Sequence, residues 1–180
     1  MPVLAHRCYP EWAPPGTALL GPLPEKAGAR RKAIAARLLE LARVSLAVLD
    51  AEAVRECLLP AARIEISGDD FAYDIDLANT VKRGLLRIER LSDLAPQAAV
   101  WRLRPDLPGQ ADLVLAGSEY PRQFSGWAKF PIPVPPEMQR AFAGVPDVAA
   151  PEGGAYCSVF APLRDSLDDI VGVLELCVTI

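Results

Sequence analysis

The densest group of side chains suited to recognising a small molecule lies between residues 120 and 130. Aromatic rings and cations alternate there, in the set Tyr120, Arg122, Phe124, Trp127, Lys129 and Phe130. Small-molecule pockets typically combine aromatic walls with a few fixed polar groups, and this segment supplies both. Arg122 can hold a carboxylate or phosphate through two parallel hydrogen bonds, whereas Lys129 offers a point charge. We therefore expect residues 118–136 to form a lid over a pocket for an anionic ligand.

The same residue types also have an ordinary structural interpretation. Trp127 and Phe130 could fill the core of a sheet while Arg122 lies at the surface. Trp101, on a separate predicted strand, could pack in the core or stack on a ligand. Near the end of the chain, Tyr156 and Ser158 alternate with apolar residues, as they would in a pocket wall or on a half-exposed sheet face. The candidate ligand-binding residues are Trp101, Tyr120, Arg122, Trp127, Lys129, Tyr156 and Ser158.

Catalytic motifs do not emerge from the sequence. His6 is the sole histidine, so a Ser–His or Cys–His mechanism would depend on it. Asp74 and Asp76 are two residues apart on a predicted helix, so they point in different directions and cannot form a carboxylate dyad. No glycine-rich phosphate loop, HExxH or GxSxG motif occurs. We therefore expect neither an enzyme nor a cofactor.

Cysteine spacing gives no metal motif. The four cysteines are Cys8, Cys57, Cys157 and Cys177. They lack the short spacings of zinc sites, and His6 with Cys8 supplies two ligands, too few for a site. Residues 1–8 lack the basic start and apolar core of a signal peptide. With no disulfide framework required, the expected location is cytoplasmic.

Composition limits the class of partner. The chain has 180 residues, 51% of them hydrophobic and 23% charged, with a net charge of −4. This is ordinary globular usage, and the negative charge argues against nucleic acid as the main partner. The longest stretch without a charged residue or histidine, 12–24, contains four prolines and so predicts no membrane-spanning helix.

Proline clusters divide the chain. Six of the 18 prolines fall within residues 1–24, which we expect to be an extended arm, because each proline fixes φ and removes a backbone donor. The remainder, 25–180, is predicted to be one domain. A second cluster at 130–136 excludes a helix or a central strand and predicts a stiff connector into a helix at 137–143.

A long helix is predicted at 25–49. Apolar and small residues recur there at three- and four-residue steps, at Ile34, Leu38, Leu41, Ser45 and Val48. Basic residues crowd its first turns, at Lys26, Arg30, Arg31 and Lys32. They form either a solvated face or a docking patch for an acidic partner.

Two shorter helices and four strands complete the pattern. Asp50 is placed to cap a helix at 51–58, and Asp69 or Asp70 to cap one at 69–91. Strands with turns between them are predicted at 98–104, 111–116, 155–161 and 170–180. The order predicts an α+β fold, with one antiparallel sheet and helices packed on it.

The last hairpin resembles that of a known family. It reads Tyr156-Cys157-Ser158-Val159-Phe160-Ala161-Pro162-Leu163-Arg164-Asp165, then Ile170-Val171-Gly172-Val173-Leu174. This resembles the closing hairpin of Cache domains, the PAS-like ligand-binding modules of bacterial signalling receptors. The first helix is similar to the family's dimerisation helix, and 138–144 is similar to its short helix before the last strands. The resemblance covers residues 27–178.

The resemblance implies a PAS-like sheet of about five strands with its ligand between sheet and lid, and a homodimer formed through 27–50. Three departures accompany it. Asp168 replaces the turn glycine, Cys177 takes the place of an aspartate of amino-acid-binding members, and Arg122 and Trp127 are more widely spaced than in those members. Amino-acid recognition is therefore not carried over. The usual flanking transmembrane helices are also absent, and an excised receptor domain would be extracytoplasmic.

These observations predict a small-molecule-sensing regulatory domain of a bacterial signal-transduction system. It would signal through its N-terminal helix to an output or partner protein outside this chain. The alternative is a ligand-free PAS- or GAF-like scaffold or dimerisation module that acts through protein contacts.

Overall fold

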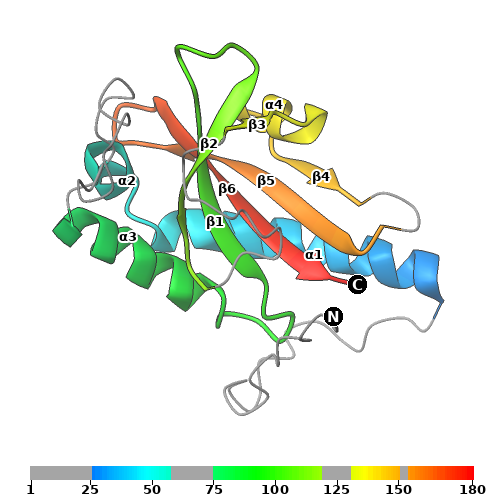
Figure 1. The fold of residues 1–180 in the computed structure, drawn as a ribbon. Coiled ribbons are helices and arrows are strands. Elements are labelled where there is room, and N and C mark those ends of the chain that lie inside the picture. The colour runs from blue at the N-terminus through cyan, green and yellow to red at the C-terminus, as the bar shows by residue number, and fades with distance from the viewer. Residues whose placement is uncertain (1–25, 58–74, 119–130, 151–153) are drawn as a thin grey trace, which may run out of the picture.

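In the described part of the chain, one antiparallel sheet carries helices on both faces (Figure 1). The computed structural model describes residues 26–57, 75–118, 131–150 and 154–180. The helices there are α1 (Ala27–Val48), α2 (Ala51–Cys57), α3 (Ile75–Ile88) and α4 (Pro136–Phe142). The strands are β1 (Gln97–Leu103), β2 (Gln110–Ala116), β3 (Ile132–Pro133), β4 (Asp147–Ala149), β5 (Tyr156–Arg164) and β6 (Ile170–Thr179). The predicted α+β class with a single antiparallel sheet is confirmed.

The sheet order is β3-β2-β1-β6-β5-β4, so the described sheet has six strands and the expected number of about five was wrong. The two unforeseen strands are β3 and β4, which are short and lie at the two edges. Pro133 lies in β3, where an edge position tolerates a residue with no backbone donor. Neither edge strand is long enough to show an alternating pattern in the sequence.

Helix α1 confirms the helix predicted at 25–49. Its buried stripe is Ile34, Leu38, Leu41, Ala42 and Ser45, at the spacing expected of one helix face. Val48, predicted to continue this stripe, is the last residue of the helix and is 40% exposed. The Ser45 hydroxyl is buried but donates to the Leu41 carbonyl at 2.7 Å, which satisfies it locally. This stripe packs on β5 and β6 together with α2 and α3, and forms the larger apolar core.

The opposite face of the sheet has a second, smaller core. It consists of Trp101, Ala111, Met138, Ala141, Phe160 and Val173, and α4 supplies two of these residues. Figure 1 shows α4 beside β3 and β4, away from α1. The predicted alternation along β5 is confirmed, because Phe160 belongs to this core whereas Cys157 and Val159 belong to the other.

Helix α2 is short and is held at both ends. The Ala53 N–H donates to Asp50 Oδ1 at 3.0 Å, so the predicted cap of this helix is confirmed. Arg55 donates to Asp165 at 2.8 Å, and Glu52 accepts from the Ser166 N–H at 2.9 Å. These contacts join α2 to the turn between β5 and β6.

The β5–β6 turn contains Asp168 in the left-handed region, with φ of +68°. This agrees with the prediction that aspartate can replace the turn glycine there, since aspartate tolerates that conformation better than most residues. Asp165 accepts backbone hydrogen bonds from Leu167 at 2.9 Å and Asp169 at 3.0 Å. The turn is therefore stabilised internally as well as by α2.

Helix α3 ends at Ile88, three residues before the predicted end at 91. The helix is followed by a 3₁₀-type turn, in which the Leu91 N–H donates to the Ile88 carbonyl. Glu89 then accepts from the N–H groups of Ala98 and Ser118, which joins the helix end to β1 and to the end of β2. The predicted start of this helix and its caps, Asp69 or Asp70, lie outside the described residues, as does the arm at 1–24.

Candidate functional site

A buried carboxylate lies on the sheet face that carries α4. Glu175, in the central strand β6, has 0% of its surface exposed. Its direct neighbours in register are Ala99 on β1 and Phe160 on β5. A carboxylate withdrawn from water this completely is stable only where it is hydrogen-bonded, so the side chains around it must be polar in part.

Trp101 supplies one of those hydrogen bonds. Its indole Nε1 donates to Glu175 Oε2 at 2.8 Å, and the tryptophan is 1% exposed. Trp101 pairs in register with Val173, two residues from Glu175, so the two side chains are diagonal neighbours on one face of the sheet. The bond fixes the indole ring against the centre of the sheet.

Ser158 continues this polar row on β5. It is 1% exposed and pairs in register with Cys177 of β6, which is also buried. In the part of the chain that the structure describes, the Ser158 hydroxyl has no hydrogen-bond partner. An unsatisfied buried hydroxyl costs about 1–3 kcal/mol, so its retention calls for an explanation.

The structure brings together two of the predicted site residues and places a third nearby. Trp101 and Ser158 share the α4 face, on either side of Glu175. Tyr156 is part-buried at the start of β5, opposite Thr179, two residues from Ser158. The burial of Ser158 and Phe160 argues against a half-exposed face for β5. Tyr120, Arg122, Trp127 and Lys129 lie outside the described residues.

Glu175 is the functional candidate that sequence reasoning missed. Strand alternation through 170–180 places Val173, Glu175 and Cys177 on one face. The available signal was one acidic residue among apolar neighbours. In a central strand covered on both faces, such a side chain is buried whichever way it points. The residue considered instead was Cys177, which lies beside Glu175 on the same face.

Cys157 faces the other core and is not a nucleophile. Burial raises the pKa of its thiol to about 11, against a smaller opposing effect of Arg31. The thiol therefore stays protonated near neutral pH, whereas a reactive cysteine needs a lowered pKa. Its role is packing.

A second buried carboxylate, Asp112, belongs to a structural ion-pair cluster. Arg104 lies 3.3 Å and Arg102 3.7 Å from its Oδ2 atom, and Asp112 is 1% exposed. Burial raises the pKa of Asp112, although both arginines oppose this effect. Two cations already face this carboxylate, so it is a poorer candidate for ligand contact than the Glu175 row.

Comparisons with known proteins do not identify a family for this chain. No family model, curated protein or solved structure matches the chain. Among the described residues, no helix has the length and apolar character to cross a membrane, and no group of three or more potential metal ligands occurs.

Proposed function

We propose that this chain is a small-molecule-sensing regulatory domain of a bacterial signal-transduction system. The ligand would lie between the 118–136 lid and the sheet face of Trp101, Ser158 and Glu175. The observation that carries the proposal is the buried Ser158 hydroxyl without a partner in the described region, beside a buried carboxylate bonded to an indole. Polar groups held on an otherwise apolar, aromatic wall are typical of small-molecule sites.

These groups also define the ligand's chemistry. Glu175 accepts hydrogen bonds, so it favours a ligand with an ammonium or hydroxyl donor. The lid cations Arg122 and Lys129 favour a carboxylate or phosphate. Together they favour a small organic acid that also carries a donor group.

The signal would pass through the sheet to α1. Residues on β5 alternate, so Ser158 faces the proposed ligand side whereas Cys157 and Val159 pack in the core beneath α1. Arg31 of α1 also donates to the Gly154 carbonyl, at 3.0 Å, just before β5. A ligand that displaces β5 would thus alter the contacts that position α1.

The test is a thermal-shift screen of the full chain against small organic acids, hydroxy acids and amino acids. A ligand at a hundredfold excess over its dissociation constant stabilises the native state by about 2.7 kcal/mol. A hit that is lost in Arg122→Ala and Ser158→Ala, but kept in the exposed control Asn79→Ala, supports the sensor. A hit that survives all three substitutions, or a screen without hits, contradicts it.

A ligand-free dimerisation module is the second candidate, and one observation favours it. Val44 and Val48 on α1 are 56% and 40% exposed and lie on one stripe of the helix. Sedimentation of the native chain and of Val44→Asp tests this function. A dimer that dissociates in the variant, together with a screen without hits, favours the module over the sensor.

A further inference from the structure

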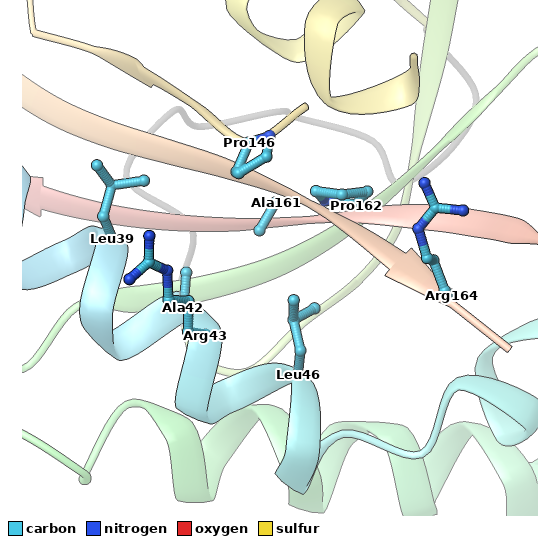
Figure 2. A pocket seen from close by; sticks show the side chains of 8 residues that line it. All are labelled: Leu39, Ala42, Arg43, Leu46, Pro146, Ala161, Pro162 and Arg164. Carbon is cyan, nitrogen blue, oxygen red and sulfur yellow. The ribbon is translucent and has the colours of Figure 1, made fainter. Parts of the chain in front are cut away.

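A hollow lies between α1 and β5, away from the Glu175 row. Figure 2 shows the side chains that line it. Its volume is about 240 Å³. Leu39 and Leu46 of α1 and Pro146 and Pro162 on the other side form its apolar walls. The rest of the lining is Ala42 and Arg43 of α1 and Ala161 and Arg164 of β5.

In the described sheet, β4 does not extend along the end of β5 that borders the hollow. In the described sheet, β4 pairs with Ser158–Phe160 only, while β5 continues to Arg164. Pro162 lies in that continuation and has no N–H to offer another strand. The hollow therefore suits a side chain that enters it better than a strand added to the edge.

The volume of the hollow favours a side chain of a partner protein over a metabolite as its occupant. Pockets that enclose a drug-sized molecule usually measure about 300–1,000 Å³, which is more than this one offers. In protein interfaces, by contrast, a few bulky apolar side chains that fill small pockets dominate the binding energy. A single large apolar side chain matches a hollow of about 240 Å³.

Helix α1 is basic, although the chain as a whole is acidic. Helix α1 carries five cations, Arg30, Arg31, Lys32, Arg37 and Arg43, against one carboxylate, Glu40. The whole chain has a net charge of −4. Of these five cations, Arg43 lines the hollow, whereas Arg31 donates to the Gly154 carbonyl and Arg37 pairs with Asp93.

Both arginines at the hollow are available for a partner. The Arg43 side chain is 71% exposed and pairs with Glu40 at 2.8 Å. The Arg164 side chain is 39% exposed, pairs with the Asp168 carboxylate at 3.4 Å and donates to the Asp168 backbone carbonyl at 2.7 Å. Exposed ion pairs of this kind contribute little to stability, so the arginines can exchange them for other carboxylates. Figure 2 shows Leu46 and Pro162 between the two arginine side chains.

We propose that this hollow, defined by Leu39, Leu46 and Pro162, docks an acidic segment of a partner protein. One bulky apolar side chain of the segment enters the hollow, and flanking carboxylates pair with Arg43 and Arg164. A second copy of the chain fits less well, because a symmetric contact through this side of α1 would bring like charges together. The docking surface does not depend on the small-molecule site on the other face.

The test uses the full chain and an array of short labelled peptides, each with one tryptophan, phenylalanine or leucine between glutamates. We expect saturable binding that weakens about tenfold or more in Arg43→Glu. Replacing the central apolar residue by alanine, or the glutamates by glutamine, should also abolish it. Leu39→Trp, which fills the hollow, should block binding without a change of charge.

The matched control is Arg83→Glu, an exposed arginine on α3 with the same change of charge. Equal weakening by Arg83→Glu and Arg43→Glu would show a non-specific charge effect and overturn the proposal. Absence of saturable binding across the array would also overturn it. So would binding to phosphatidylserine vesicles that is lost in Arg43→Glu while the peptides do not bind, since this would identify a membrane surface as the partner.

Discussion

The Trp101 indole donates a 2.8 Å hydrogen bond to the Glu175 carboxylate across strands β1 and β6. Both side chains are buried on the face that carries α4. The bond joins the two central strands through their side chains, in addition to the backbone ladder. It therefore links the stability of the sheet to the geometry of the candidate ligand site.

Replacing Trp101 by phenylalanine should lower the free energy of unfolding by about 2–3 kcal/mol, since the buried Glu175 side chain loses this hydrogen bond and the smaller ring leaves a cavity. Urea denaturation measures the change. In the double variant with Glu175→Leu, the loss should be smaller than the sum of the two single losses, because both substitutions remove the same bond. Additive losses would show that the two residues act independently.

Substitution of Asp165 should make stability less dependent on pH in acid. Burial alone would raise the pKa of Asp165, but hydrogen bonds from Asp169, Leu167 and Arg55 outweigh it and lower the pKa. Because the folded pKa lies below the unfolded one, the stabilisation is complete above about pH 4 and is lost as pH falls through the folded pKa.

The stability difference between the native chain and Asp165→Asn should therefore be largest at neutral pH and shrink below about pH 3. Urea unfolding at both pH values measures it. A difference that stays constant would mean that the carboxylate charge contributes nothing to the turn.

Gly172 permits close packing of β6 against β1. A Cβ atom there would lie 2.9 Å from the backbone oxygen of Trp101, which cannot move without shifting β1. Gly172→Ala should lower the free energy of unfolding by about 1–3 kcal/mol, the usual cost of overpacking.

Gly28→Ala is its matched control. No atom lies within 4 Å of that added Cβ, and the residue is in the first turn of α1, so alanine should leave stability unchanged or raise it by up to about 0.5 kcal/mol. Thermal denaturation of both variants gives the comparison. Equal effects at the two glycines would contradict the packing explanation.

Asp50→Ala should cost about 1 kcal/mol of stability, because the Ala53 N–H loses its partner at the start of α2. Asp50→Ser keeps an oxygen acceptor at the cap and should restore most of the loss. Guanidinium denaturation of the three proteins distinguishes them. If serine and alanine behave alike, the Asp50 side chain does not act as a cap.

The sequence predicted the elements that carry strong local patterns. Helix α1 follows from apolar residues at helical steps, and the faces of β5 follow from strict alternation at Tyr156 to Ala161. The cap at Asp50 and the left-handed Asp168 follow from the chemistry of aspartate. In each case the interactions that decide the structure lie within a few residues.

Features set by distant contacts were missed. Strands β3 and β4 form because an edge of the sheet is available to them, and two or three residues carry no periodic pattern. Glu175 was not predicted as a site residue, because the Trp101 indole that donates to its Oε2 atom lies 74 residues away in the sequence. Likewise, the hollow beside Arg43 and Arg164 depends on how α1 crosses β5.

The pairing of β1 with β6 also has a consequence for the order of assembly. Hairpins β1–β2 and β5–β6 join neighbouring segments, whereas the central pair joins residues 72 to 80 positions apart, from Trp101 with Val173 to Gln97 with Cys177. Closing a loop of that length costs more entropy than forming a local hairpin, so this step governs the folding rate. During synthesis, both hairpins can form before they meet. The candidate site therefore does not exist in the nascent chain until β6 has left the ribosome.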